Sequence, residues 1–344
     1  GERDFTWRFY PESTDSPRQL NAILKKSKNH FKKDYISNPA SQLYERNGLN
    51  YCWQPLLAGG GTATVWKEIR KGNKSVLFIS ITHPFPETDA LKKAETALAN
   101  LQTADISLLR QAHRDWWHNY YPQSFISLPD KKIENFYWAQ MYKLASATRV
   151  GGGLLDNSGP WQVLTPWPNT WWNLNVQLSY WPVYASNRLE LGMPVVDAIN
   201  NNFENLINNV PEAYRKDAAA LPVATDFNLV GVDVRVPGSK PFAQVGNLPW
   251  LCHNLWLQYR YSMDESILRN TVYPTLRRAI NFYLPFLEED GQGILHLKET
   301  YSPEYGNAKD CNYDLALLRW GCLTLLEACR ILSINDELCP TWQH

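Results

Sequence analysis

Apolar residues recur at helical spacing over most of residues 130–344, and long polar loops separate the successive runs, notably at 149–172, 215–248 and 289–312. The first run begins behind Asp130, a candidate helix N-cap, and we expect further helices over 173–191, 195–209, 249–262, 265–288 and 313–332. Helices joined by long loops are typical of a ring of helix pairs with a site at its mouth. An irregular helical bundle fits the same pattern.

The preceding residues predict a different structure. Val- and Ile-rich runs on either side of a Gly-Asn turn, within residues 45–85, predict a β-hairpin. Helical spacing then returns over 87–102 and 107–121. These two helices would link a β-domain to the helical part, and 344 residues suffice for two domains.

The composition argues against nucleic-acid, membrane and metal-dependent functions. Lys and Arg number 34, as do Asp and Glu, and the net charge of +0 gives no attraction to nucleic acid. No run approaches the roughly 18 apolar residues of a membrane-spanning helix. The six cysteines, which we expect to be small buried hydrophobes, form no Cys-x-x-Cys pair. No motif predicts a metal, and no phosphate-binding loop predicts a nucleotide cofactor.

Aromatic side chains are abundant, with 15 Trp, 18 Tyr and 12 Phe making up 13% of the chain. Aromatic faces stack on the C–H faces of sugars, but wide protein cores use Trp and Tyr as well. Asn173 and Asn175 stand two residues apart at the head of an aromatic-rich helix, after Trp171 and Trp172. Paired amides at this place suit a pocket that holds a polar ring, or the N-cap of the helix.

Two acidic residues in the loops are further candidates. Asp226 is the lone acid in the apolar stretch ATDFNLVG. Glu304 follows Ser302-Pro303, which favours an extended approach, and Tyr301 and Tyr305 flank it. A carboxyl group held partly out of water keeps its proton more readily, which suits a general acid, although a solvated loop acid fits the residues too.

Several motifs together resemble glycoside hydrolase family 95, the inverting α-L-fucosidases and related α-L-galactosidases. The stretch NLNVQLSYWPV at 173–183 is similar to the family's Asn-Ile-Asn-x-Gln-Met-Asn-Tyr-Trp-Pro-Ala. Ser302-Pro303-Glu304 is similar to its Ser-Pro-Glu loop. The stretches HRDWWHNYY, WLCHNLWLQYRYS and YDLALLRW occur in the family's order, and the agreement extends from about residue 60 to 340.

The resemblance implies a mostly α fold, part of a six-fold α/α toroid preceded by the end of a β-sandwich domain and linker helices. Residues 1–86 would be the C-terminal part of the sandwich, 87–129 the helical linker, and 130–344 the N-terminal portion of the toroid catalytic domain. The implied chemistry is hydrolysis of α-L-fucosyl or related α-L-galactosyl bonds with inversion, by a periplasmic or secreted enzyme without a cofactor.

The resemblance also implies roles for individual residues. Glu304 would be the general acid. Asn173 and Asn175 would hold the attacking water, one of them acting as a base activated by an aspartate much further along the chain. The residues implied to bind the sugar are Trp171, Trp172, Trp181, Asp226 and Tyr305, although one of the three tryptophans belongs to the core by our interpretation. Trp171 stands where the family usually has His, which favours galactose or another sugar over fucose.

Two other functions fit the sequence. A non-catalytic carbohydrate-binding relative would keep the aromatic residues and lack the chemistry. Another toroid enzyme, such as an α-L-rhamnosidase or a glycoside phosphorylase, would share the fold. In each case the expected partner is a carbohydrate.

The chain is shorter than the implied architecture. A six-fold toroid has six helix pairs, roughly twice what we expect from residue 130 onward. We therefore expect a truncated portion of a longer enzyme, in which the apolar helix 315–332 has no later partner. Its exposed apolar face would favour self-association. Little or no hydrolysis is expected from these 344 residues alone.

Overall fold

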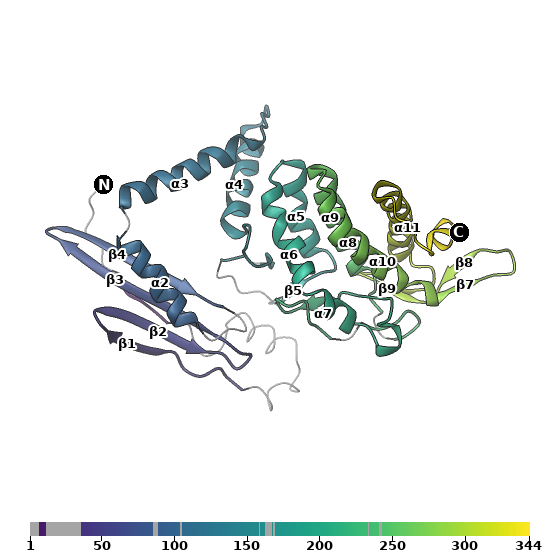
Figure 1. Cartoon of the computed structure of the whole chain (residues 1–344), viewed down its shortest axis with the longest axis horizontal. Helices are drawn as coiled ribbons and strands as arrows, with labels where there is room; N and C mark the ends of the chain where they lie inside the picture. Colours follow the sequence, from purple (N-terminus) through teal and green to yellow (C-terminus); the bar gives the residue numbers. More distant parts are fainter. Residues whose placement is uncertain are drawn as a thin grey trace. The chain divides into compact units, whose positions relative to one another are not determined.

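Figure 1 shows the computed structural model of the chain, which describes residues 7–11, 36–84, 89–103, 105–157, 159–161, 167, 169–232, 234–240 and 243–344. The start of the helix expected over 87–102 and parts of the loops expected over 149–172 and 215–248 lie outside these residues. The chain divides into two compact units, Gly1–Asn119 with Val163–Pro166, and Tyr120–Gln162 with Trp167–His344.

The first unit contains one antiparallel sheet with its strands in chain order: β1 (Gln42–Arg46), β2 (Leu49–Pro55), β3 (Gly61–Lys71) and β4 (Lys74–Thr82). The predicted hairpin is confirmed, because β3 pairs with β4 and Gly72 adopts the left-handed backbone of the turn (φ 58°). Helices α2 (Ala90–Thr103) and α3 (Ile106–Tyr120) follow the sheet.

Helix α2 covers one face of the sheet. Its residues Ala90, Ala94 and Leu98 are four apart and therefore share a face, which packs on Tyr51 and Val65. The structure differs here from the expected sandwich, because within the described residues a helix, and not a second sheet, packs against this face.

The second unit is dominated by helices, in agreement with the predicted helical class. Asp130 caps α4 (Lys131–Ala147) as expected, since its Oδ1 accepts hydrogen bonds from two amides of the first turn. The other α-helices are α5 (Asn175–Ala185), α6 (Met193–Asn201), α7 (Phe203–Asn208), α8 (Asn247–Ser262), α9 (Glu265–Ile267), α10 (Tyr273–Asn281), α11 (Asn312–Leu332) and α12 (Cys339–Gln343). Short 3₁₀ segments η1 (Tyr121–Gln123), η2 (Leu189–Gly192), η3 (Glu212–Tyr214) and η5 (Leu284–Phe286) and the π-helical η4 (Leu268–Val272) join them.

Two expected helices end earlier than predicted. The helix expected over 173–191 stops at Ala185, and Asn187 adopts the left-handed conformation (φ 57°) that asparagine tolerates. The helix expected over 265–288 ends at Asn281, and the chain continues through η5 into a hairpin of β7 (Leu287–Glu289) and β8 (Leu295–Leu297). Two more short antiparallel pairs, β5 (Thr170–Trp171) with β6 (Ala224–Thr225) and β9 (Thr300–Ser302) with β10 (Gly306–Ala308), were not predicted.

Helix α8 is central to the second unit, because it packs against α5, α10 and α11. Figure 1 shows α5, α8, α10 and α11 side by side. Buried amides join the helices, since Asn254 of α8 donates to the Gln177 carbonyl of α5 at 2.9 Å. Helix α12 packs on the end of α11 and buries Trp342, so the expectation that the apolar helix 315–332 has no later partner is wrong for that end.

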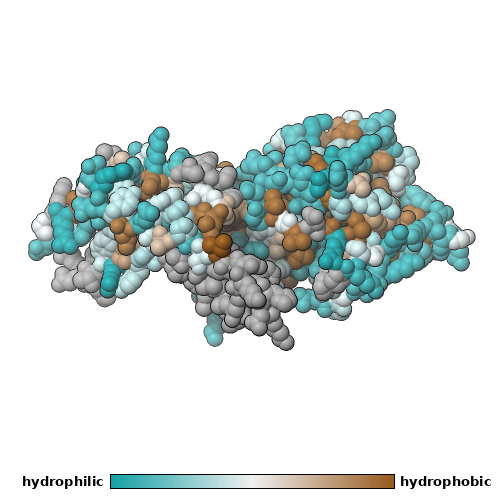
Figure 2. All heavy atoms as spheres, turned by 90° about the horizontal axis from the view of Figure 1, so that it is seen from below, coloured by the Kyte–Doolittle hydropathy of each residue, from teal (hydrophilic) through white to brown (hydrophobic). Residues whose placement is uncertain are grey.

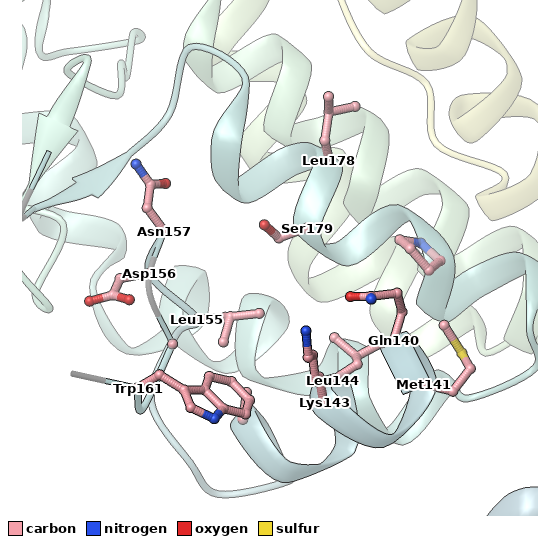
Figure 3. Close-up of a pocket in the computed structure, with 13 residues that line it drawn as sticks. Gln140, Met141, Lys143, Leu144, Leu155, Asp156, Asn157, Trp161, Leu178 and Ser179 are labelled. Carbon is pink, nitrogen blue, oxygen red and sulfur yellow. The ribbon is translucent and has the colours of Figure 1, made fainter. Parts of the chain in front are cut away.

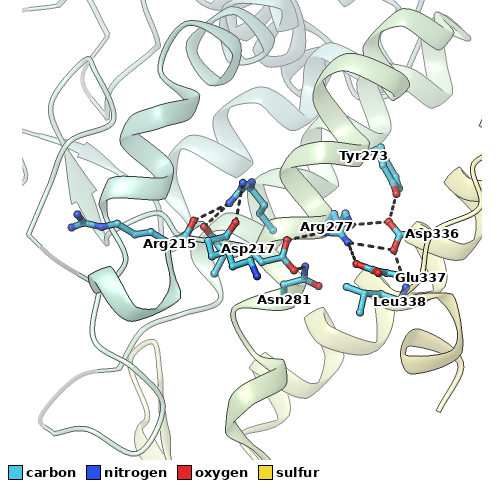
Figure 4. Close-up of polar contacts among 11 residues, drawn as sticks. Arg215, Asp217, Tyr273, Arg277, Asn281, Asp336, Glu337 and Leu338 are labelled. Atoms are coloured by element: carbon cyan, nitrogen blue, oxygen red, sulfur yellow. Dashed lines mark hydrogen bonds and ion pairs between the residues drawn. The ribbon is translucent and has the colours of Figure 1, made fainter.

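An ion-pair network fixes α10 to its neighbours (Figure 4). Arg277 Nε lies 2.7 Å from Asp336 Oδ2, and its Nη1 lies 2.6 Å from Asp217 Oδ1. Tyr273 also donates to Asp336, and Asn281 donates to Asp217. One guanidinium thus joins α10 to the segments that follow η3 and α11.

The surface and the cysteines carry few special features. On the face drawn in Figure 2, apolar side chains are scattered among hydrophilic ones. All six cysteines are free, and four of them are buried. No helix in the described ranges has the length and apolar character needed to cross a lipid bilayer.

Candidate active site

One pocket of about 450 Å³ joins segments of the second unit that are far apart in the sequence. It is formed by the start of α5 with the residues before it, the first turn of α8, the β9–β10 turn and the first turn of α11. Its lining residues are Trp167, Trp171, Asn173, Leu174, Asn175, Trp250, Ser302, Pro303, Glu304, Tyr305 and Tyr313. Four predicted site residues besides Glu304, namely Trp171, Asn173, Asn175 and Tyr305, therefore meet here.

The two asparagines lie at the start of α5 without capping it. Leu174 occupies the N-cap position, and no side chain makes a cap hydrogen bond there. Asn173 and Asn175 are half-buried, and within the described ranges neither side chain has a recorded hydrogen bond. The capping alternative therefore does not explain the pair, and both amides remain available to a ligand or a water molecule.

Glu304 stands in the turn between β9 and β10. It adopts a left-handed backbone (φ 66°), which is unusual outside glycine, and Tyr305 N donates to Ser302 O at 3.1 Å to close the turn. The side chain of Glu304 is exposed and Tyr305 is 94% exposed, so the partial burial expected for this acid is not observed. Its carboxylate projects from a short hairpin at the pocket.

A buried aspartate holds this hairpin in place. Asp314, in the first turn of α11, is fully buried and accepts hydrogen bonds from Thr300 Oγ1 at 2.6 Å and Tyr283 OH at 2.7 Å. Burial raises the pKa of Asp314 to about 6, although the two hydroxyl donors oppose this shift. A backbone bond from Tyr301 N to Ala243 O, at 3.0 Å, fixes the same strand from its other side.

Aromatic rings form much of the pocket wall. Tyr313 stands edge-on to Trp250, with 5.9 Å between ring centroids. A Cβ at Gly246 would lie 2.4 Å from Tyr313, so the glycine before α8 makes room for this ring. Among the described residues, Tyr313 OH and Trp171 Nε1 are buried polar atoms without a hydrogen-bond partner. Both could bind a ligand's polar groups.

Three of the predicted sugar-binding residues lie outside this pocket. Trp172 is fully buried and donates from Nε1 to Thr225 Oγ1 at 2.9 Å, so it is a core residue. Asp226 accepts hydrogen bonds from the backbone amides of Asn228 and Val230, both at 2.9 Å, and closes a turn. Trp181 lies further along α5, with its ring centroid 6.0 Å from that of His253.

Sequence reasoning missed three aromatic lining residues, Trp167, Trp250 and Tyr313. The signal was present for two of them, because Trp250 and Tyr313 begin the stretches WLCHNLWLQYRYS and YDLALLRW. An aromatic residue in the first turn of α8 and of α11 could have been assigned to the pocket. In the described part of the chain, no three His, Cys, Asp or Glu side chains are grouped to hold a metal ion.

Comparisons with known proteins indicate the family of the chain. Residues 100–344 match the model of the glycosyl hydrolase family 95 catalytic domain. Alpha-L-fucosidase 2 of Arabidopsis thaliana is 24% identical over 220 residues, which cover 60% of this chain and 26% of that protein. Probable alpha-fucosidase A of Aspergillus niger is 26% identical over 188 residues, which cover 52% of this chain and 23% of that protein.

A solved structure shares the fold. A proposed kojibiose phosphorylase from the human microbiome superposes with a TM-score of 0.62 at 11% identity, over 88% of this chain and 47% of that one. At this low sequence identity, the superposition shows a shared fold and nothing about function. The chain matches about a quarter of the length of the two curated relatives.

Proposed function

The chain belongs to glycoside hydrolase family 95, and from this premise we propose that it hydrolyses α-L-fucosyl or related α-L-galactosyl bonds in oligosaccharides with inversion. One observation carries the proposal. Asn173 and Asn175, which the resemblance assigns to the attacking water, line the same pocket as Glu304, which it assigns to the general acid. The three residues come from segments about 130 positions apart in the sequence.

The chemistry assigns a different task to each side of the pocket. Glu304 protonates the oxygen of the departing group, a step for which its exposed turn position leaves room for a bulky leaving group. The amide oxygens of Asn173 and Asn175 accept hydrogen bonds from the water that attacks from the other face of the sugar. One of them, the base that the resemblance implies, takes the proton that this water loses and passes it to solvent after the step. Inverting hydrolases keep about 6.5–9.5 Å between acid and base to accommodate this water.

The pocket walls suit a sugar ring. Trp171, Trp250 and Tyr313 offer aromatic faces to C–H groups. A cavity of about 450 Å³ accommodates a terminal monosaccharide with part of the group to which it is linked.

The finer architecture is also a proposal. We infer that residues 130–344 form the N-terminal portion of a six-fold α/α toroid, which the superposition on the phosphorylase supports. The sheet of the first unit would be the C-terminal part of a β-sandwich. Ile79 and Ile81 support this, because they are exposed on β4 and alternate with residues that face α2, which suits a second layer on the other face.

Anomer-resolved NMR of the reaction tests the function. The full-length protein is incubated with aryl and oligosaccharide α-L-fucosides and α-L-galactosides, and the first sugar released is observed before it mutarotates. We expect the β-anomer to appear first, at a rate independent of phosphate. Release of the α-anomer first, turnover that requires phosphate, or turnover of α-L-rhamnosides alone would each contradict the proposal. Binding of the sugars without release would favour the non-catalytic carbohydrate-binding function instead.

A further inference from the structure

A second pocket, here called the α4–α5 pocket, lies between α4, α5 and residues 155–157 and 159–161 (Figure 3). Its volume is about 360 Å³. Leu155, Leu178 and Met141 supply apolar surface, and the indole of Trp161 stands at one side. This pocket shares no lining residue with the candidate active site.

The walls of the α4–α5 pocket are fixed by specific contacts. Leu155 N donates to Tyr180 OH at 2.9 Å, which attaches this wall of the pocket to α5 at Leu155. Gly159 has a left-handed backbone (φ 57°), and a Cβ there would lie 3.0 Å from the six-membered ring of Trp161. The indole therefore packs on the bare glycine backbone, while 41% of Trp161 stays exposed. The exposed part of the indole is an aromatic surface at the pocket.

Polar side chains surround this aromatic surface. Gln140 and Lys143 come from α4 and Asn157 from the facing segment, and none of the three has a recorded hydrogen bond to another described residue. Asp156 also lines the pocket. One cationic and one anionic side chain favour a neutral ligand over a strongly charged one. An aromatic face with amide, ammonium and carboxylate groups around it suits a ring that has C–H faces and hydroxyl edges.

The two pockets lie on consecutive turns of one helix. Leu174 and Asn175 line the candidate active site, and Leu178 and Ser179 line the α4–α5 pocket. Ser179 Oγ donates to the Asn175 carbonyl at 2.8 Å. Four residues advance a helix by about 6 Å, which is close to the length of one sugar residue in a chain.

We propose that the α4–α5 pocket binds a sugar ring of the glycan chain from which the candidate active site removes a terminal residue. The inference rests on the proposed function, because it takes the same oligosaccharide as the ligand. The pocket then contributes affinity for the branch or backbone of the glycan, and Trp161 is its stacking residue. Small aryl glycosides are too short to reach this pocket, so it adds nothing to their affinity.

Calorimetric titration tests the proposal in the Glu304→Gln background, where turnover is suppressed. The ligands are an α-L-fucosylated tetrasaccharide, its defucosylated trisaccharide core and methyl α-L-fucoside. We expect Trp161→Ala to weaken binding of the tetrasaccharide and of the core by about tenfold, the loss expected for one aromatic contact of about 1.4 kcal/mol. Affinity for methyl α-L-fucoside should change by less than about twofold.

Two control substitutions separate this role from a general effect. Trp116→Ala removes a tryptophan of similar exposure (44%) on α3 and should leave all three affinities unchanged. Trp161→Phe keeps an aromatic face and should restore most of the affinity for the core. A second test uses a combined Gln140→Ala and Lys143→Met variant on α4, which leaves the indole in place. This variant should lower the affinity for the trisaccharide core by at least threefold.

The outcomes distinguish the two proposals. This inference would be overturned if Trp161→Ala and the α4 variant both bound the trisaccharide core within twofold of the parent affinity. It would also be overturned if Trp161→Ala weakened binding of methyl α-L-fucoside as much as binding of the core. Failure of the proposed function has a separate signature. In that case the full-length protein with Glu304 intact would release no sugar in the NMR assay, while the core would still bind in a Trp161-dependent manner.

Discussion

Thr300 donates a hydrogen bond from Oγ1 to Asp314 Oδ2 at 2.6 Å, and this bond joins the strand that leads to Glu304 with the first turn of α11. Tyr313, beside Asp314 in the chain, lines the candidate active site. One buried carboxylate thus fixes the position of the hairpin relative to the pocket wall. A buried charge is unfavourable without such partners, and here two hydroxyl donors compensate it.

Thr300→Val should loosen this connection. Valine has the shape of threonine but no hydroxyl donor, so Asp314 would keep Tyr283 as its one hydroxyl donor in the described structure. We expect the free energy of unfolding to fall by roughly 1–3 kcal/mol, measured by urea denaturation. Thr300→Ser keeps the donor and should lower the free energy of unfolding by less than half as much. If both variants lost the same stability, the effect would come from packing and not from the hydrogen bond.

Asp314→Asn should change how stability depends on pH. The pKa of Asp314 in the folded protein is about 6, against 3.8 ordinarily, so between those values the folded protein binds a proton that the unfolded chain releases. The stability contribution of this carboxyl is therefore complete below about pH 4 and is lost as pH rises through 6. Wild-type stability minus that of Asp314→Asn should fall by roughly 2 kcal/mol between pH 4 and 7. A difference that is constant across this range would contradict the raised pKa.

The helices and the β3–β4 hairpin could be predicted because their signals are local. Asp130 caps α4 as its position before an apolar run indicates, and the Gly-Asn turn sets the hairpin. The pairing of the asparagines with Glu304 in one pocket could be anticipated only through the family resemblance. No local pattern places residue 173 beside residue 304.

The remaining features depend on contacts that a single sequence does not record. Trp171 and Trp172 are chemically identical, and the pairing of β5 with β6 puts the first in the pocket and the second in the core. Asp314 lies inside a run that otherwise predicts an apolar helix. Its role depends on Thr300 and Tyr283, which come from separate segments. The exposure of Glu304 depends on the β9–β10 turn, which is too short to predict by alternation.

Glu304→Gln should lower activity in proportion to the difficulty of the leaving group. Glutamine keeps the size of the side chain but is too weak an acid to protonate the leaving group. The kcat on an oligosaccharide should therefore fall roughly 10²–10⁴-fold. An activated aryl glycoside needs little protonation and should lose far less. Glu299→Gln is the matched control, because Glu299 precedes the same hairpin and pairs with Lys240 at 3.5 Å. Equal losses on both substrates would rule out the acid role of Glu304.

Arg277→Met should destabilise the second unit. The substitution removes the partner of Asp336, whose side chain is only 6% exposed, and leaves that carboxylate with Tyr273 and one backbone amide. Burial alone would raise the pKa of Asp336, but its hydrogen bonds with Arg277 and Tyr273 outweigh burial and lower it. We expect a loss of roughly 2–4 kcal/mol by urea denaturation. Arg269→Met, at an exposed position of η4, should change stability by less than about 0.5 kcal/mol.

Asn173→Ala and Asn175→Ala should reduce kcat while leaving stability and substrate binding nearly unchanged. A residue that holds the attacking water acts mainly in the transition state, so kcat should fall while KM stays within a few-fold. Because neither side chain caps α5, the free energy of unfolding should change by less than about 0.5 kcal/mol. Asp130→Ala provides the comparison, because Asp130 does cap its helix. This variant should lose about 1 kcal/mol of unfolding free energy and keep its kcat. Near-normal kcat in both asparagine variants, or a stability loss as large as that of Asp130→Ala, would show that the pair is structural and that the water is held elsewhere.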